Sequence, residues 1–550
     1  MLGRWQGGFC EIEGPLRFIT VRGRQVPSRH RSVKKGENGV RQPRTRSSTS
    51  GTGQRLPMRS FCVLLLWWSI VRGASVAPTP PAPTLVREFR GLWVASKANI
   101  DWPSAPGLTS AQQQAELLRL LDTAVKLHLN AVVFQVRPQA DALYESALEP
   151  WSEYLTGHEG LPPLPHWDPL AFAVREAHSR GLELHAWVNP FRARSPTAKS
   201  PIGRQHLAKL HPEWALQCGD QLWLDPGLSA VQEHSRRVLL DIVERYDLDA
   251  LHMDDYFYPY PQHGRPFPDD ASYDRYTRGG GRLERAAWRR QNVDQFVHDL
   301  GTAIHRQKPW VKFGISPFGI WRPGNPPQIK GLDAYEVLGA DSRKWLQEGW
   351  VDYLTPQLYW PIDRPEQSFA ALLPWWAQQN TRGRNLWPGL DLTRIGSDRK
   401  ASEIGRQIRL TRRVKGVSGV ILWNATALQA NREGVATLLK QQLFASPALI
   451  PASPWLVEPV PLQPKLRATL EPGGRRLVLQ WDLNDRKTVR SMALQCRVGR
   501  QWTTELLAGT TKVRIFDRRQ GSIVPDEVLL TPISRTSVAG RSAAWRRIGK

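Results

Sequence analysis

Short apolar runs alternate with longer amphipathic segments between residues 87 and 445. Each run has the length of a buried strand, and the segments between them, such as 111–128 and 169–180, carry apolar residues at helical spacing. Eight repeats of strand then helix predict a parallel (β/α)8 TIM barrel. The expected strands are Arg90–Ala95, Ala131–Arg137, Leu182–Asn189, Ala250–Asp254, Val311–Ser316, Tyr353–Tyr359, Asn385–Asp391 and Val417–Trp423.

Polar and apolar residues alternate within these strands, which gives each strand two different faces. The apolar face packs on helices, and the other face points into the barrel. The alternation therefore predicts an inward set of Gln135, Arg137, His185, Trp187, Asn189, His252, Asp254, Thr355, Gln357 and Tyr359. Because active sites of such barrels lie at the C-terminal strand ends, polar residues gathered there predict a functional mouth. His185 and His252 are equally compatible with structural, hydrogen-bonded histidines.

The pattern changes at both ends of the chain. Residues 1–57 are basic and predict a disordered extension, or one that is not translated, because Met58 begins a plausible signal peptide over 58–77. An uncleaved signal anchor is the alternative, and 78–86 is a linker. After the barrel (87–445), Pro-rich 446–464 reads as a second linker. Strand-like runs then predict a small β-sandwich-like domain at 465–530, followed by a basic, disordered tail at 531–550.

Composition narrows the class of protein. The net charge is +25, but the excess of Lys and Arg lies mainly in the first 60 and last 100 residues, with no nucleic-acid-binding motif. We therefore expect no nucleic-acid partner, and membrane association only through an uncleaved signal segment. The four cysteines have no CxxC spacing, which argues against zinc or a disulfide framework. The 24 tryptophans suit stacking on sugar rings as well as core packing.

Two adjacent carboxylates, Asp254 and Asp255, end the fourth strand within DALHMDDYFYPYP. Glycoside hydrolysis needs one carboxyl group to protonate the leaving oxygen and another to act as nucleophile or general base. Asp254, which points inward, is the leading candidate, and Asp255 lies where strand becomes loop. Metal binding or capping of the next segment are the alternatives for such a pair. Further acids are Asp141 and Asp391, with Glu145 and Asp225 weaker.

Other residues near the expected mouth have side chains suited to binding a glycan. Hydroxyl, carboxylate and acetamido groups can be bound by Arg137, Asn189, Gln357 and Tyr359. Stacking surfaces can come from Trp102, Trp151, Trp187, Tyr256, Trp360 and Trp423. There is no glycine-rich phosphate loop, HExxH or GxSxG motif, so nucleotide, zinc-protease and esterase chemistry are disfavoured. We expect no cofactor and no metal.

Several long segments resemble the glycosyl-hydrolase-like family 10 of bacteria. They are, in order, REFRGLWVASKANIDWPS, NAVVFQVRPQADALYESALEPWSEYLTG, GLELHAWVNPFRA, DALHMDDYFYPYP and VDYLTPQLYW. The resemblance covers about residues 87–440. It implies a TIM-barrel glycosidase exported to the periplasm or cell wall and acting on peptidoglycan strands stripped of their stem peptides. Its motifs match Asp101, Arg137, Asp141, Asn189, Asp254, Asp255, Gln357 and Tyr359, but not Asp391 or Glu145.

Three hypotheses follow. The first is an exported glycoside hydrolase that cleaves peptidoglycan glycan, with Asp254, Asp255 and Asp141 as catalytic carboxylates. The second is a non-catalytic glycan-binding or wall-scaffolding protein on an inactive barrel. The third is a hydrolase of an exogenous polysaccharide. The several acids expected at the mouth favour an enzyme over a binding protein.

Overall fold

The computed structural model describes residues 80–547 except 263, 484 and 486. The basic extension (1–57), the expected signal peptide (58–77) and the last three residues of the chain lie outside this range. In the part that is described, no helix is long and apolar enough to cross a membrane.

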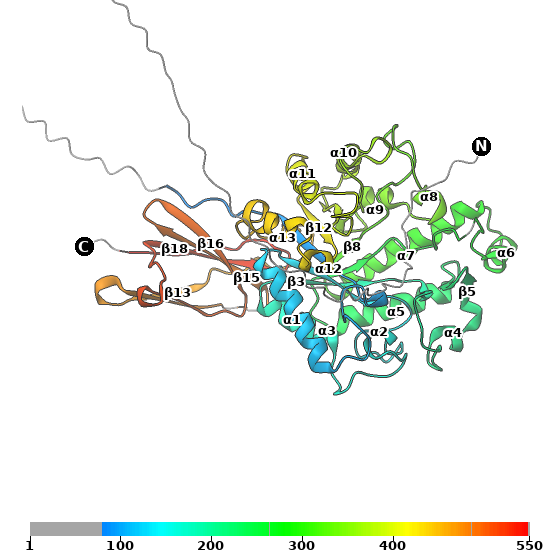
Figure 1. Ribbon diagram of the computed structural model, residues 1–550, viewed down its shortest axis with the longest axis horizontal. Coiled ribbons are helices and arrows are strands. Elements are labelled where there is room, and N and C mark those ends of the chain that lie inside the picture. The colour runs from blue at the N-terminus through cyan, green and yellow to red at the C-terminus, as the bar shows by residue number, and fades with distance from the viewer. Residues whose placement is uncertain (1–79, 263, 484, 486, 548–550) are drawn as a thin grey trace, which may run out of the picture. The chain divides into compact units, whose positions relative to one another are not determined.

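A parallel sheet with the order β10-β9-β8-β7-β3-β2-β1-β12-β11 forms the centre of the fold (Figure 1). Its strands are β1 (Phe89–Val94), β2 (Ala131–Arg137), β3 (Glu183–Val188), β7 (Ala250–Met253), β8 (Lys312–Ile315), β9 (Tyr353–Leu354), β10 (Asn385–Leu386), β11 (Gly389–Asp391) and β12 (Gly419–Trp423). All eight expected strands are present, because β10 and β11 together make the seventh.

The sheet closes through this divided seventh strand. The amide of Trp387 donates to the Leu354 carbonyl at 3.0 Å, on the β9 side. The Leu386 carbonyl accepts from the Ser418 amide at 3.2 Å, on the β12 side. Since β12 also pairs with β1, the eight strands form a ring. The predicted (β/α)8 barrel is confirmed.

Helices surround the strands (Figure 1). The capping box of Thr109 and Gln112 begins the first of them, and the Asp168 side chain caps another by accepting from the Ala171 amide. The main connecting helices are α1 (Ser110–Lys126), α3 (Pro169–Ser179), α5 (Ser229–Arg245), α7 (Arg285–Gln307), α9 (Ser342–Glu348), α10 (Phe369–Gln379), α11 (Ala401–Thr411) and α13 (Val435–Leu438). The remaining α-helices among the described residues are α2 (Glu153–Thr156), α4 (Leu207–Leu210), α6 (Asp270–Arg278), α8 (Ala334–Val337) and α12 (Ala425–Gln429).

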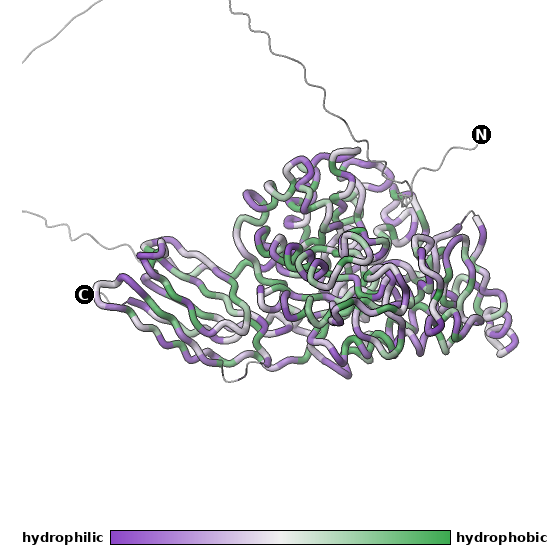
Figure 2. The backbone as a smooth tube through the Cα atoms, turned by 60° about the horizontal axis from the view of Figure 1, so that its bottom comes forward, coloured by the Kyte–Doolittle hydropathy of each residue, from purple (hydrophilic) through white to green (hydrophobic). Residues whose placement is uncertain are grey.

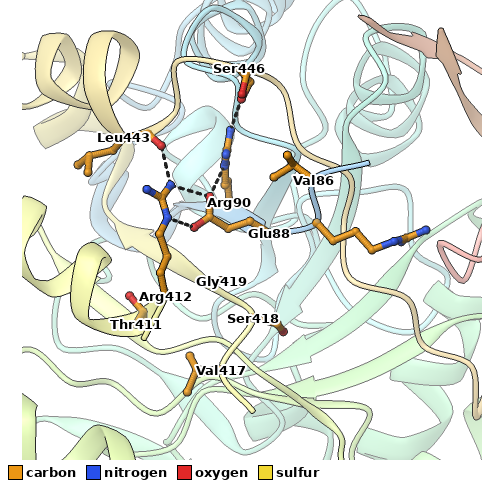
Figure 3. A pocket seen from close by; sticks show the side chains of 11 residues that line it. Val86, Glu88, Arg90, Thr411, Arg412, Val417, Ser418, Gly419, Leu443 and Ser446 are labelled. Carbon is orange, nitrogen blue, oxygen red and sulfur yellow. Dashed lines mark hydrogen bonds and ion pairs between the residues drawn. The ribbon is translucent and has the colours of Figure 1, made fainter. Parts of the chain in front are cut away.

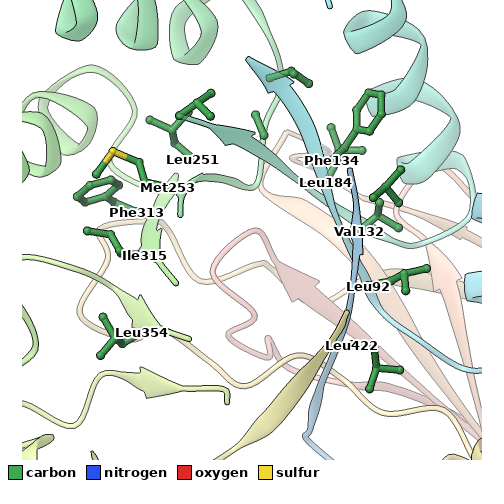
Figure 4. Close-up of a cluster of buried hydrophobic side chains, with 14 of the residues drawn as sticks. Leu92, Val132, Phe134, Leu184, Leu251, Met253, Phe313, Ile315, Leu354 and Leu422 are labelled. Carbon is green, nitrogen blue, oxygen red and sulfur yellow. The ribbon is translucent and has the colours of Figure 1, made fainter. Parts of the chain in front are cut away.

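Burial follows the predicted two faces of the strands. One buried cluster lies between strands and helices and includes Leu184, Leu251 and Met253 (Figure 4). A separate cluster fills the inside of the barrel with aromatic and small residues, among them Trp187 and Tyr353. Alternate residues of one strand therefore enter different cores, which fixes the strand register.

A small antiparallel sheet interrupts the barrel between β3 and α5. It consists of β4 (Arg192–Arg194), β5 (Ala215–Cys218) and β6 (Gln221–Leu224), in the order β4-β6-β5. The sequence pattern did not predict it. The excursion matters for the site because β4 begins directly after the C-terminal end of β3.

Two antiparallel sheets, which share one buried cluster, follow the second linker. They are β13-β14-β17 (Lys465–Leu470, Arg476–Asp482, Val513–Asp517) and β16-β15-β18-β19 (Gln501–Ala508, Val489–Val498, Glu527–Ser534, Ala543–Arg546). Buried residues alternate with more exposed ones along β14, and hydrophobic and hydrophilic segments alternate along the chain in Figure 2. The expected β-sandwich is confirmed, but the expected disordered tail is corrected, because β19 lies within 531–550 and pairs with β18.

Candidate active site

The acidic pair follows β7 directly. Leu251 and Met253 enter the cluster behind the strands, so His252 and Asp254 turn into the barrel. Both Asp254 and Asp255 are buried. Two carboxyl groups therefore lie at the C-terminal end of the barrel. The alternation of polar and apolar residues predicted this position for Asp254.

Three donors hold the carboxylate of Asp254. Nε1 of Trp187 donates to Oδ2 at 3.1 Å, and Nδ2 of Asn189 donates to Oδ1 at 2.9 Å. The amide of Tyr256 adds a 3.3 Å hydrogen bond to Oδ1. Burial raises the pKa of Asp254, while the charge of Arg192 and these hydrogen bonds oppose the rise. The hydrogen bonds and Arg192 therefore favour the ionised form, although the net direction of the pKa shift is upward.

Asp255 has a different environment. The hydroxyl of Tyr260 donates to its Oδ2, and Gln357 provides a further side-chain hydrogen bond. Burial, followed by the charge of Asp254, raises the pKa of Asp255 to about 7. The two neighbouring carboxyl groups are thereby separated in acidity, and Asp255 keeps its proton to higher pH. An acid catalyst and its carboxylate partner need this difference in acidity.

Arg192 is a site residue that the sequence analysis did not single out. Its guanidinium lies 4.1 Å from the ring centre of Tyr256 and 5.4 Å from that of Trp223, and Nη1 donates to the Pro138 carbonyl at 3.0 Å. It is the cation whose charge stabilises ionised Asp254. The signal was its place in GLELHAWVNPFRA, three residues after inward-facing Asn189.

Aromatic rings surround the pair on the inner face. The ring of Trp423 is centred 6.0 Å from that of Trp187 and 6.2 Å from that of Trp93. Tyr359 packs edge-on against Trp93 at 6.4 Å. Trp423 and Tyr359 are half-buried, whereas Trp187 is buried, so the first two retain accessible surface. Flat rings beside carboxylates are typical of sugar-binding clefts.

Other predicted binding residues support the site from further away. Trp102 is buried behind the barrel against Phe134 and donates to the Gln113 carbonyl at 2.9 Å, which leaves no face for a sugar. Asp101 accepts from the amides of Ala95 and Thr426, both at 2.8 Å, and so joins the β1 and α12 ends.

Arg137 and Trp360 also have protein partners. Arg137 is ion-paired with Glu149 and donates to the Asn189 carbonyl, so it supports a residue that binds Asp254. Trp360 is half-buried, with its ring centred 5.6 Å from that of Phe318.

Asp141 is buried in the loop after β2. Its Oδ2 accepts from Nε2 of Gln139 at 3.2 Å. Burial, opposed by a hydrogen bond from Ser152 and supported by the charge of Glu159, raises its pKa to about 7. Asp141 can therefore hold a proton, but these partners lie outside the group that surrounds Asp254 and Asp255.

Asp391 lies on the inner face at the end of β11, since Leu390 enters the outer cluster. Its Oδ1 accepts from the amide and hydroxyl of Thr393 at 2.8 and 2.6 Å. Burial and the charges of Asp391 and Asp255 together raise the pKa of Tyr359 well above its ordinary value. Tyr359 is therefore close to both carboxylates.

The two weaker acids lie elsewhere. Glu145 is exposed, and its amide donates to Asp168 at 3.4 Å. Asp225 accepts from the Ser272 hydroxyl at 2.6 Å, which ties it to α6. Among the described residues, no group of three or more His, Cys, Asp or Glu is arranged to hold a metal ion.

A cavity of about 400 Å³ lies at the opposite, N-terminal ends of the strands, beside Glu88, Arg90 and Arg412 (Figure 3). Its charged groups already bind one another. Glu88 accepts from Nε of Arg90 at 2.8 Å and from Nε of Arg412 at 2.6 Å. Arg90 and Arg412 also donate to the carbonyls of Ser446 and Leu443 at 2.7 and 2.5 Å. The ion pairs and hydrogen bonds that line this cavity connect the first strand of the barrel with its last helices.

Comparison with known proteins agrees with this geometry. The family model Glycosyl hydrolase-like 10 matches residues 88–403. Glycosyl hydrolase YngK of Bacillus subtilis is 39% identical over 416 residues, covering 73% of this chain and 81% of its own. Glycosyl hydrolase DigH of Escherichia coli K12 is 34% identical over 401 residues, covering 67% and 90%.

Among solved structures, the chain is matched with the PgaB (BpsB) glycoside hydrolase domain from Bordetella bronchiseptica. It is 14% identical, has a TM-score of 0.40, and the match covers 64% of this chain and 98% of that one. The catalytic domain of β-amylase from Paenibacillus polymyxa is 11% identical, with a TM-score of 0.45 and coverage of 65% and 98%. The expected class, a glycoside hydrolase, is confirmed at the level of the family. The chain belongs to the Glycosyl hydrolase-like 10 family.

Proposed function

We propose that this protein hydrolyses glycosidic bonds in the glycan strands of peptidoglycan, with Asp255 as the proton donor. One observation carries the chemistry: two adjacent buried carboxyl groups at a strand end are held in unlike environments. Asp255 has its pKa raised to about 7, and Asp254 is bound by three hydrogen-bond donors. A neutral acid beside a stable carboxylate is what glycoside cleavage requires.

In the proposed reaction, the Asp255 carboxyl group transfers its proton to the glycosidic oxygen as the bond from that oxygen to the anomeric carbon breaks. Positive charge develops on the sugar ring. In its ionised form Asp254 stabilises this charge, and its donors and Arg192 favour that form against burial, which raises the pKa. Water then adds to the anomeric carbon, and its proton is taken up by a carboxylate.

A third carboxyl group serves as nucleophile or general base, and the two candidates are Asp391 and Asp141. Asp391 is favoured over Asp141 by its inner-face position and by Tyr359, which is close to both Asp391 and Asp255. Asp141 is favoured by the family motif. Replacing each by Asn in turn distinguishes them, because loss of the nucleophile or base lowers turnover by several orders of magnitude and loss of a buried structural acid lowers stability instead.

The choice of glycan rests on the resemblance and on the rings at the mouth. Half-buried Trp423 and Tyr359 offer surfaces for sugar rings near the carboxylates. The signal peptide expected at 58–77 would deliver the enzyme to the wall. Two other functions compete: non-catalytic glycan binding by an inactive barrel, and hydrolysis of an exogenous polysaccharide.

One experiment separates the three. The purified protein is incubated with intact sacculi, with peptide-free glycan strands and with plant polysaccharides, and soluble products are identified by mass spectrometry. Reducing sugars released from peptide-free strands are expected. Retention on glycan without products would support the binding protein, and products from plant polysaccharides alone would support the third function.

Matched variants connect the products to the site. D254N should abolish hydrolysis and leave the circular dichroism spectrum unchanged, since Asn has nearly the same shape. E145Q, at an exposed acid, should retain full activity. Full activity of D254N would contradict the assignment.

A further inference from the structure

The centre of the barrel contains a chain of polar side chains below the catalytic pair. Barrel interiors are usually filled by layers of bulky branched residues. Here His185, His252 and Tyr353 are completely buried on the inner face. Room for the Tyr353 ring comes from Gly314 on β8, where an added Cβ would collide with it. This replacement of apolar packing calls for an explanation.

The side chains are joined end to end by hydrogen bonds. Trp93 Nε1 lies 3.3 Å from His252 Nε2, and Nδ1 of His252 is 3.0 Å from the Tyr353 hydroxyl. The same hydroxyl is 3.0 Å from His185 Nδ1, and His185 Nε2 is 3.0 Å from Glu183. We call this set the axial column: Trp93, His252, Tyr353, His185, Glu183 and Lys312, whose Nζ donates to Glu183 at 2.8 Å.

The two ends of the axial column fix the direction of every hydrogen bond in it. An indole nitrogen can only donate, so His252 Nε2 accepts from Trp93 and His252 carries its proton on Nδ1. His252 Nδ1 then donates to Tyr353, whose hydroxyl donates to His185 Nδ1.

At the other end, the Glu183 carboxylate, ionised beside Lys312, can only accept. His185 Nε2 must therefore carry a proton. The Trp93 end and the Glu183 end therefore give the same donor directions. With the opposite directions, the unprotonated Nε2 of His185 would face the Glu183 carboxylate, and neither could donate.

The axial column reaches the mouth through Ser316. The Ser316 hydroxyl lies 3.0 Å from His252 Nε2, to which it donates, and 3.4 Å from its other acceptor, the Met253 carbonyl. The Ser316 carbonyl accepts from Nε2 of Gln357 at 2.9 Å, and Gln357 also hydrogen-bonds Asp255. Ser316 is thus held from one side by His252 and holds Gln357 on the other.

We propose that His252 and Tyr353 are positioning residues for the acid Asp255, acting through Ser316 and Gln357. The fixed order of the axial column keeps His252 neutral, with Nε2 unprotonated and accepting from both Trp93 and Ser316. Ser316 then presents its carbonyl so that the Gln357 amide is aimed at Asp255. This inference rests on the proposed role of Asp255 for its effect on turnover, but not for the tautomers.

Several groups besides Gln357 act on Asp255, and each stays in place in the test. Asp254 lies next to it in the chain, and Tyr260 donates to it from the same loop. Tyr359 approaches from the end of β9. Facing His252 are His185, Tyr353, Trp93 and Ser316.

The tautomers are tested without substrate. The full chain is labelled with 15N-histidine, and the signals of His185 and His252 are assigned from H185Q and H252Q. We expect neutral His252 protonated on Nδ1 and His185 protonated on Nε2 across pH 5–8. A His252 proton on Nε2, or a charged His252 in this range, would overturn the proposal.

The coupling is tested with Y353F and S316A, each of which removes one hydroxyl. The carboxyl pKa of Asp255 is followed by 13C NMR, and kcat and KM by glycan release. Loosening the Gln357 hydrogen bond should raise the pKa of Asp255 and move the alkaline limb of kcat to higher pH. We expect kcat to fall roughly tenfold with KM unchanged, as for a misplaced catalytic group.

Y258F is the matched control, because Tyr258 is also completely buried and its hydroxyl binds Asn292 outside the axial column. It should leave the Asp255 pKa unchanged. If Y353F and S316A fold but leave both the pKa and kcat as in the parent, the positioning role is refuted. If the parent cleaves no glycan, the proposed function fails, whereas the NMR measurements still decide the coupling.

Discussion

Nε1 of Trp187 donates a 3.1 Å hydrogen bond to Oδ2 of Asp254, from one strand end to the next. This bond lowers the pKa of Asp254 against the effect of burial. In W187F the donor is lost, so that pKa should rise and the acid limb of the kcat profile should move to higher pH. Turnover at the optimum should fall roughly tenfold.

The pH profile of W187F is measured beside that of W360F. Trp360 is half-buried against Phe318 and donates nothing to Asp254. An acid limb that stays in place in W187F would show that Asp254 is not the group that must be ionised.

Removing the proton donor gives a second prediction. D255N cannot protonate the leaving oxygen, so kcat on natural glycan should fall by about 10²–10⁴-fold. An aryl glycoside with an acidic leaving group needs little protonation, and its turnover should fall far less. The ratio of the two losses, measured on one preparation, is the diagnostic quantity. Equal losses on both substrates would indicate a different role for Asp255.

Tyr260 allows a test of the acidity of Asp255 that preserves both carboxyl groups. Its hydroxyl donates to Asp255 and lowers the pKa of that group, which burial and Asp254 raise to about 7. In Y260F the pKa of Asp255 should rise further. Because the protonated form is active in the proposed reaction, the alkaline limb should move to higher pH while the acid limb stays. A shift to lower pH would contradict the assigned direction.

The sequence predicted the barrel well because its signal is local. Alternation within strands of six or seven residues, such as Ala131–Arg137, places side chains on one face or the other regardless of what lies nearby. The same argument placed Asp254 on the inner face. It could not tell that Trp187 and Asn189 would bind Asp254, because that depends on the spacing between neighbouring strands.

Contacts from outside the regular pattern were less predictable. The charge of Arg192 acts on Asp254 from a segment between β3 and α5 that has no strand–helix repeat. Tryptophan is a residue type suited to stacking on sugars, but the indole of Trp102 is buried in the core behind the barrel. The strand β19 lies in a basic segment whose few apolar residues gave no clear alternation. In each case tertiary packing decided the outcome.

The buried carboxylate of Asp249, just before β7, gives the last prediction. Its Oδ2 accepts from the Leu184 amide at 2.8 Å and lies 2.8 Å from Nε2 of His178. Its Oδ1 is 2.7 Å from Nη2 of Arg490, on β15 of the C-terminal sheets. Burial alone would raise the pKa of Asp249, but the charges of Arg490 and His178 hold it far below its ordinary value.

In R490M the buried Asp249 loses the charge of Arg490 and keeps that of His178, so the free energy of unfolding at pH 7 should fall by about 3–5 kcal/mol. A depressed carboxyl pKa stabilises the fold above the unfolded value of about 3.9, and this contribution is lost at lower pH. The difference from the parent should therefore be largest near neutral pH and shrink below about pH 4. R497M, on the same strand but paired with Glu527 within its own domain, is the control. Urea unfolding at pH 7 and pH 3.5 measures both variants, and a difference independent of pH would show that packing, not charge, makes Arg490 stabilising.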